Sequence, residues 1–181
     1  MKKILALVLV STLVFVSCEG DQGPPGEDGL DGLQGQVFEV EGVDFAYESE
    51  FNLYSAPFAL EEYTNFDILE QDGLLIYRYG DLRDVEGNIV NGWELLPLTA
   101  YDGEGRSFQY GFSHAQLDAE VRITSEFNIS DLEAGYTQDQ IFRFIILPND
   151  WAPEAGLNKN NMEEVMNSLK IDKIERLNLK N

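Results

Sequence analysis

The sequence predicts a mainly β protein: an antiparallel β-sandwich with one short C-terminal helix, preceded by a signal peptide and an extended collagen-like tether. Three observations lead to this fold class. Short apolar segments alternate with turn residues every ten residues or so from Val37 onward. One segment near the C-terminus has helical periodicity, and glycine occupies every third position over residues 20–35. We therefore expect a signal peptide at 1–17, a lipidated tether at 18–37 and the β-sandwich at 38–181.

The composition fits one globular domain and argues against a nucleic-acid-binding surface. The 181 residues include 33 acidic and 12 basic side chains, which gives a formal charge of -21. Binding nucleic acid through phosphate neutralisation requires a clustered basic surface, whereas residues 18–77 contain no Lys or Arg. With 44% hydrophobic and 12% aromatic residues, the chain has enough apolar side chains for a packed core. It is therefore not a disordered acidic tail.

Residues 1–17 have the layout of an export signal. Lys2 and Lys3 precede an apolar run that reaches Val16. This run is too short to cross a bilayer as a helix, and no second apolar stretch approaches the roughly 18 residues that a spanning helix needs. We therefore expect an exported chain that does not span the membrane with a helix.

Cys18 follows the apolar run and is the only cysteine of the chain, so it has no partner for an internal disulfide. Residues 13–18 resemble a bacterial lipobox, with Ser17 as the small residue before the cysteine and Phe15 in place of the usual leucine. The resemblance implies that Cys18 carries a diacylglyceryl group and becomes the mature N-terminus. Two or more acyl chains, at about 0.8 kcal/mol per buried methylene, hold a domain firmly on a membrane. The alternative interpretation is an incidental free thiol.

Six glycines follow the cysteine at strict three-residue spacing, which arises by chance on the order of once in ten million. Collagen uses this repeat because only glycine fits at the axis of its triple helix. Here the repeat is short and carries four acidic residues without a basic partner, so three adjacent chains would repel one another. We expect a solvated tether of up to roughly 60 Å, with a trimer as the alternative. The repeat glycines are Gly20, Gly23, Gly26, Gly29, Gly32 and Gly35.

The strands of the folded domain are predicted from apolar residues that recur with a period of two. Residues 80–88 are predicted to be a turn-rich connection, and Pro97 limits the strand before it to an edge or an end. The nearly continuous apolar run at 141–147 predicts a central strand buried on both faces. The other predicted strands are 36–41, 43–47, 51–54, 74–79, 93–96, 108–112, 121–123 and 127–129.

Residues 159–169 form the one segment that favours a helix. An asparagine cap and early glutamates precede apolar residues with the spacing of a buried stripe. The tail at 174–179 is expected to close the sheet as a last strand. The helical stripe consists of Met162, Val165, Met166 and Leu169.

The chain resembles the collagen-like lipoproteins of flavobacteria and their relatives over essentially the whole mature sequence. The resemblance rests on the lipobox, the GPPG-containing repeat and several motifs of the folded domain. It implies a lipid anchor and a stalk, and it implies no catalytic residue. Glu19 and Asp21 are similar to the acidic signal that sends Bacteroidota lipoproteins to the outer face of the outer membrane. The domain motifs are GQVFE at 35–39, LIYR at 75–78, Trp93 with LPL at 96–98, and QIFR at 140–143 with ILP at 146–148.

No motif points to catalysis or to a cofactor. His114, the only histidine, adjoins Ser113, and strand neighbours point to opposite faces, so the two do not form a catalytic dyad. One histidine and one cysteine are too few ligands for a zinc or iron site. We therefore expect a protein that is not an enzyme.

A weak calcium site in the segment 80–88 is the one metal candidate. Its side chains offer hard oxygen ligands, and Gly87 allows a turn. An EF-hand loop would also need a glutamate at the position of Gly92, so a solvated hairpin turn is the favoured alternative. The candidate ligands are Asp81, Asp84, Glu86 and Asn88.

We expect a non-enzymatic, surface-displayed lipoprotein whose β-sandwich serves adhesion, envelope structure or partner binding, with a protein or a glycan as its ligand. The first alternative is a carbohydrate-binding accessory lipoprotein, because Trp93, Trp151 and the many tyrosines could stack on sugar rings. The second alternative is a C1q-like trimeric binding module.

Overall fold

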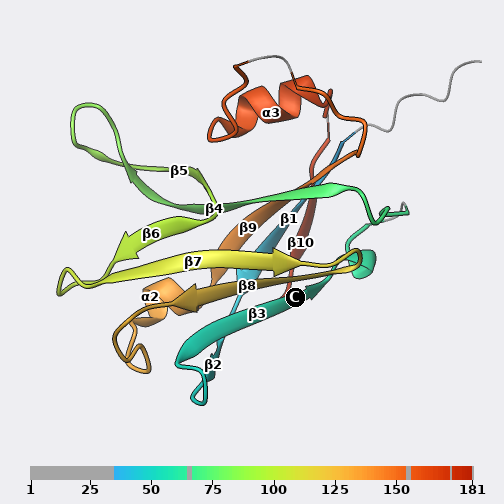
Figure 1. Cartoon of the computed structure of the whole chain (residues 1–181). Helices are drawn as coiled ribbons and strands as arrows, with labels where there is room; N and C mark the ends of the chain where they lie inside the picture. Colours follow the sequence, from blue (N-terminus) through green and yellow to red (C-terminus); the bar gives the residue numbers. More distant parts are fainter. Residues whose placement is uncertain (1–34, 65–66, 154–155, 172, 181) are drawn as a thin grey trace, which may run out of the picture. The chain divides into compact units, whose positions relative to one another are not determined.

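The computed structural model describes residues 35–64, 67–153, 156–171 and 173–180, which form two five-stranded sheets packed face to face (Figure 1). The strand order is β10-β1-β9-β4-β5 in the first sheet, called sheet A, and β2-β3-β8-β7-β6 in the second, called sheet B. Neighbouring strands are antiparallel except for β1 and β10, which pair in parallel. The predicted mainly β sandwich with a short C-terminal helix is confirmed. The predicted signal peptide and nearly all of the tether lie outside the described residues.

The elements have the following bounds. Sheet A contains β1 (Gln36–Val43), β4 (Gly73–Arg83), β5 (Ile89–Leu95), β9 (Gln140–Leu147) and β10 (Glu175–Asn178). Sheet B contains β2 (Ala46–Glu48), β3 (Leu53–Ala59), β6 (Leu98–Tyr101), β7 (Ser107–His114) and β8 (Asp118–Thr124). The helical elements are the 3-10 turn η2 (Leu60–Glu62), α2 (Ala134–Thr137) and α3 (Met162–Ser168).

The β4–β5 hairpin is longer than predicted. The ladder continues from Gly80 opposite Gly92 to Arg83 opposite Ile89, where the sequence predicted a turn-rich connection. The backbone is paired throughout, but the face that carries Gly80 and Gly92 has no large apolar side chain at those two positions. The signal of period two is therefore lost within a continuous strand. The prediction of a connection at 80–88 was wrong for residues 80–83, which belong to β4, and right for the turn at 84–88.

Three other boundaries differ from the prediction. Residues 127–129 are not a strand, because the Asn52 amide donates to the Phe127 carbonyl (2.8 Å) and accepts from the Ile129 amide (3.1 Å). The Asn52 side chain thus makes the hydrogen bonds that a neighbouring strand would make. Because Ile129 is buried, residues 127–129 still show the apolar alternation of a strand. Neither β6 nor α2 was predicted, since both are only four residues long. β1 starts at Gln36, so the last two residues assigned to the tether belong to a strand.

β9 lies in the middle of sheet A, and its two faces are both buried, as its apolar run predicted. Phe142, Phe144 and Ile146 enter the core between the sheets, where the Phe144 ring stacks on Phe38 at 4.8 Å. Ile145 and Leu147 point to the opposite face and belong to a second apolar cluster. Sheet A therefore needs a cover on the face that sheet B does not reach.

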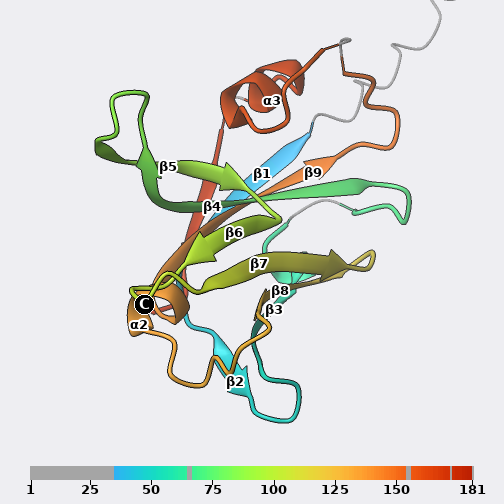
Figure 2. The same ribbon diagram turned by 60° about the vertical axis from the view of Figure 1, so that its left-hand side comes forward.

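α3 provides that cover, on the side of sheet A away from sheet B (Figures 1 and 2). The Asn161 side chain caps the helix by accepting from the Glu164 amide at 3.3 Å. Val165 and Leu169 are buried against the sheet, and both Trp93 and Trp151 pack in this second cluster. The tryptophans are therefore not gathered on one exposed strand face.

A buried ion pair lies beneath α3. Arg143 and Glu39 are cross-strand neighbours on β9 and β1, and the Arg143 Nε lies 3.0 Å from a Glu39 carboxylate oxygen. The guanidinium also lies 4.0 Å from the Trp93 ring and 3.4 Å from the Met162 sulfur. The second Glu39 oxygen forms an ion pair with Arg176 on β10 at 3.3 Å. This pair thus connects three strands of sheet A with the helix that covers them.

We predict that Arg143→Ala lowers the free energy of unfolding by about 3 kcal/mol, because it leaves the buried Glu39 carboxylate with only the exposed Arg176 as a counter-ion. The matched control is Arg122→Ala, which breaks a half-exposed pair with Glu120 (3.2 Å) and costs less than about 1 kcal/mol. Urea denaturation of both variants measures the difference. Equal losses would show that the buried pair has no special structural role.

Candidate functional site

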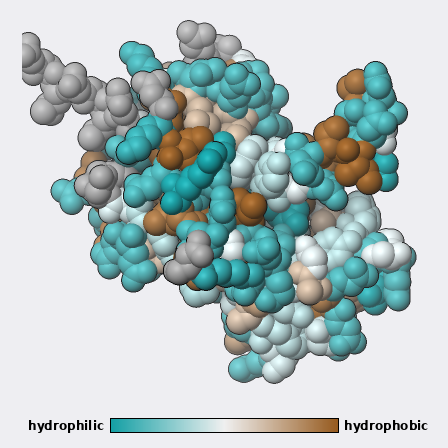
Figure 3. Space-filling model, turned by 180° about the vertical axis from the view of Figure 1, so that it is seen from behind, coloured by the Kyte–Doolittle hydropathy of each residue, from teal (hydrophilic) through white to brown (hydrophobic). Residues whose placement is uncertain are grey.

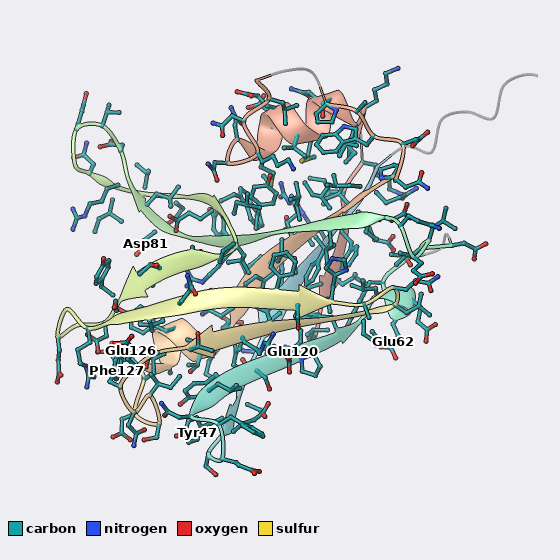
Figure 4. The ribbon with its side chains drawn as sticks, in the orientation of Figure 1. Tyr47, Glu62, Asp81, Glu120, Glu126 and Phe127 are labelled. Atoms are coloured by element: carbon teal, nitrogen blue, oxygen red, sulfur yellow. The ribbon has the colours of Figure 1, made fainter. Side chains whose placement is uncertain are left out.

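A cleft of about 800 Å³ opens between the two sheets, below the β4–β5 hairpin. Strands β4, β5 and β6, helix α2 and the start of β9 line it. Its volume lies within the usual range for small-molecule sites, about 300–1,000 Å³. Asp81, one of the lining residues, is labelled in Figure 4. The hairpin above the cleft projects from the sandwich and exposes apolar side chains, which form the brown projection in Figure 3. These are Val85, Ile89 and Val90.

Two opposed glycines lie in the hairpin that lines the cleft. Side chains two residues apart share a strand face, so Arg78 and Gly80 face sheet B together with the core residue Ile76. Gly92 lies directly opposite Gly80 in the ladder. A Cβ atom at position 80 would lie only 2.5 Å from the Arg78 Nη1 atom. Gly80 thus leaves room for the Arg78 side chain, and Gly92 leaves room for Leu82, whose Cδ1 atom would clash with a Cβ at position 92.

Arg78 is held rigidly at the inner end of the cleft. Its Nε and Nη2 atoms both donate to the Gln140 side-chain oxygen, at 2.9 and 2.6 Å. Gln140 is itself buried, and its amide nitrogen donates to the carbonyls of Gly135 (3.0 Å) and Gln138 (2.7 Å). The guanidinium carbon lies 4.6 Å from the centre of the Tyr110 ring. Arg78 is therefore positioned by neutral groups.

The charge of Arg78 has no partner among the described residues. No Asp or Glu there forms an ion pair with it, although Glu94 stands directly opposite in the ladder. Its Nη1 atom has no acceptor in this part of the chain, and every buried side-chain nitrogen or oxygen described has a partner. Nη1 is therefore open to the cleft. In a chain with a formal charge of -21, this arrangement is unusual.

A chain of tyrosine hydrogen bonds supports the far wall. The Tyr110 hydroxyl donates to the Tyr136 carbonyl at 2.6 Å, and the Tyr136 hydroxyl donates to the Tyr101 carbonyl at 3.2 Å. These bonds connect β7 with α2 and β6. Burial raises the pKa of Tyr110 to about 12, and the nearby Arg78 charge opposes that rise. The Tyr110 hydroxyl therefore stays protonated at neutral pH.

The charged side chains that line the cleft comprise three acids and two bases. Arg83 donates to the Gly87 carbonyl at 3.2 Å, and Asp139 pairs with Lys180 at 3.1 Å. The lining thus offers carboxylate oxygens to hydroxyl donors, and it offers an anion two guanidinium groups without an ion pair, the exposed Arg83 and the half-buried Arg78. No nucleophile stands beside a histidine base in the lining. The charged lining residues are Arg78, Arg83, Asp81, Glu94 and Asp139.

The predicted calcium ligands Asp84, Glu86 and Asn88 come together as the turn of the β4–β5 hairpin. One Asp84 carboxylate oxygen accepts from the amides of Glu86 (2.9 Å) and Asn88 (2.8 Å), and hydrogen bonding to Asn88 lowers the pKa of Asp84. Gly87 adopts the positive φ that the turn requires. Asp81 lines the cleft instead. In the residues that the structure describes, no group of three or more His, Cys, Asp or Glu side chains could hold a metal.

The β6–β7 hairpin repeats the same turn with the same Asp-x-Glu-Gly pattern. Asp102 accepts from the amides of Glu104 (3.0 Å) and Arg106 (2.8 Å), and Gly105 has positive φ. Here the Arg106 side chain occupies the second carboxylate oxygen at 2.7 Å. Because this turn forms with a cation from the protein itself, the acidic residues serve hairpin geometry in both places.

The remaining predicted site residues lie apart from the cleft. His114 is exposed at the end of β7, lines a smaller pocket of about 290 Å³ at the opposite end of the sandwich, and has Nδ1 3.4 Å from its neighbour's carbonyl. Cys18 and the repeat glycines 20–32 lie outside the described residues. Gly35 is buried, and a Cβ there would come within 2.8 Å of Leu169. The last glycine of the repeat therefore has a packing role.

Sequence reasoning missed Arg78, Gln140 and the glycine pair. The available signal was the presence of Gly80 and Gly92 near the ends of two apolar segments, because glycine within a strand often marks a close approach of backbone or ligand. Nothing in the sequence shows that Gln140 meets Arg78, since 62 positions separate them.

The chain matches no protein-family model, no curated protein and no solved structure. Across the described ranges, no helix is both long and apolar enough to span a membrane.

We predict that the free energy of unfolding is constant from neutral pH up to about pH 10 and falls between about pH 10 and 12. An unfolded tyrosine ionises near pH 10, whereas burial keeps Tyr110 and Tyr77 neutral up to about 12, so alkaline pH favours the unfolded chain. Urea denaturation at a series of pH values measures this fall. Tyr110→Phe flattens the pH dependence, and Tyr101→Phe, at an exposed position, leaves it unchanged. Identical curves for wild type and Tyr110→Phe would contradict the assignment.

Proposed function

We propose that this protein is a lipid-anchored binding protein of the outer membrane surface, without catalytic activity, whose β-sandwich binds a polar ligand in the cleft between its sheets. The observation that carries this proposal is Arg78, fixed on Gln140 and Tyr110 with Nη1 open to the cleft. Holding a charged group without a counter-ion costs stability. An external ligand that pairs with the guanidinium recovers that cost.

The N-terminal sequence supports surface display. Cys18 provides the lipid anchor, and the acidic residues Glu19 and Asp21 resemble an export signal to the cell surface. The base-free segment 18–77 repels anionic head groups and keeps the tether solvated. The strand β1 begins directly after the last glycine of the repeat. The tether thus continues into the domain that carries the cleft.

We also propose that the ligand is a glycan. The tyrosines of the cleft support this proposal, and the tryptophans do not. Trp93 and Trp151 are partly buried in the cluster under α3 and do not line the cleft. Tyr101, by contrast, is 63% exposed and lines the cleft together with Tyr136. Aromatic rings beside several carboxylates suit the two surfaces of a sugar ring, one apolar and one rich in hydroxyl groups.

We predict that Cys18→Ala abolishes both labelling by radioactive palmitate and retention in the membrane fraction. The sulfur of Cys18 is the only thiol of the chain, and no other side chain can replace it in a thioether. Ser17→Ala serves as the control, because alanine is also small and preserves the lipobox. Labelled lipid on the Cys18→Ala protein would contradict the anchor.

We predict that Gly80→Val lowers the affinity for the ligand at least about tenfold, which corresponds to about 1.4 kcal/mol. The new side chain fills the cleft wall and displaces the Arg78 guanidinium. The matched control is Gly111→Val on β7, where a Cβ meets nothing within 4 Å. The mature lipoprotein in detergent is tested on an array of saccharides and peptides. Wild-type binding by Gly80→Val, or an equal loss in Gly111→Val, would contradict a ligand site in the cleft.

A further inference from the structure

We infer that the ligand of the cleft is a saccharide with a single carboxylate, and that Arg78 binds this carboxylate. The inference rests on the proposed function and names the ligand class of the same site. It draws on the donors that Arg78 leaves open, on the charges that surround them, and on the tyrosines of the lining.

The open donors of Arg78 fit a carboxylate. A guanidinium has five N–H groups in a planar fork, and Gln140 uses one from Nε and one from Nη2. Gln140 leaves the two on Nη1 and the second on Nη2, and the Tyr110 hydroxyl lies close enough to the guanidinium for one hydrogen bond, so at least two donors remain for a ligand. Neighbouring Nη1 and Nη2 donors match the two oxygens of a carboxylate in a bidentate pair. Because Gln140 is neutral, the positive charge of Arg78 is available to that pair.

Tyr110, Gln140 and Gly80 restrict the approach to the Arg78 guanidinium. The Tyr110 ring covers one face of the guanidinium at 4.6 Å, and Gln140 occupies its Nε edge. The backbone of Gly80 lies beside Nη1, where any larger residue would place a Cβ within 2.5 Å. A ligand therefore reaches the guanidinium from the cleft, past the two opposed glycines.

The acids of the lining set the charge of the ligand. The lining holds three acids, Asp81, Glu94 and Asp139, against two bases, Arg78 and Arg83, so a phosphate group with two negative charges is repelled more strongly than a carboxylate with one. A ligand with one carboxylate and several hydroxyl groups suits both the positive charge of Arg78 and the carboxylates of the lining. Its carboxylate pairs with Arg78, and its hydroxyl groups donate to the protein carboxylates in charge-assisted hydrogen bonds. Tyr101 and Tyr136 offer apolar ring faces to the sugar.

Glu94 competes with the ligand. It lies opposite Arg78 in the β4–β5 ladder, and both residues line the cleft. Like charges in one site repel, so Glu94 weakens the binding of any carboxylate there. Replacing Glu94 with glutamine removes the repulsion and keeps the shape of the side chain. This variant is expected to bind the acidic saccharide more tightly, which a purely structural role of Arg78 would not produce.

The test compares an oligosaccharide of glucuronic acid with its neutral glucose counterpart by isothermal titration of the mature lipoprotein in detergent. Wild type is expected to bind the acidic sugar at least about tenfold more tightly. Arg78→Gln removes this preference, Arg78→Lys keeps part of it, and Glu94→Gln increases it. Arg122→Gln makes the same change of charge on sheet B and preserves the preference. Thermal melting of each variant checks that it is folded.

Several outcomes would overturn the inference. Equal affinity for both sugars, a preference that survives Arg78→Gln, or tighter binding of inorganic phosphate or of a peptide C-terminus would each contradict it. If Gly80→Val still abolishes binding in those cases, the cleft is a ligand site and only the ligand class is wrong. If no saccharide or peptide binds the wild-type protein at all, the proposed function fails together with the inference.

Discussion

The burial of sheet A on both faces is the constraint on which the rest of the structure depends. Its central strand β9 sends Phe142 and Phe144 toward sheet B and Ile145 toward α3, so neither face is left to water. The β4–β5 hairpin extends beyond both sheet B and α3, which cover the two faces of sheet A. Beyond Ile76 its face toward sheet B carries Arg78 and then Gly80, and the core between the sheets gives way to the cleft. The site thus arises where the packing that stabilises the fold ends.

Two arginines of sheet A show how surroundings separate a structural role from a binding role. Arg143 is buried beneath α3 against the carboxylate of Glu39, and its charge is neutralised within the protein. Arg78 lies on the neighbouring strand and the opposite face, where it donates to the neutral Gln140. Both guanidinium groups contact an aromatic ring. The difference is the missing counter-ion, which leaves Arg78 available to a ligand.

Local patterns in the sequence predict most of the fold and little of the site. The apolar run of β9, the asparagine cap of α3 and the closing strand β10 are visible because their signals lie within a few residues. The full length of β4 and β5 cannot be predicted from the sequence, because Gly80 and Gly92 interrupt the alternation of apolar and polar residues. Residues 127–129 were wrongly predicted to form a strand, because their backbone hydrogen-bonds to the side chain of the distant Asn52 and not to another strand. The cleft depends on Arg78 meeting Gln140 across strands, and only the fold brings them together.

The most direct test of the central claim is a nitrogen-15 NMR titration of the arginine Nε–H signals with the glucuronic acid oligosaccharide. Arg78 and Arg143 both have Nε donors fixed by hydrogen bonds, so they serve as probe and internal control. We predict that the Arg78 signal and the backbone amides of Gly80 and Gly92 shift with saturation, while the Arg143 signal stays in place. Shifts confined to other surfaces, or an Arg78 signal unchanged at saturation, would contradict it.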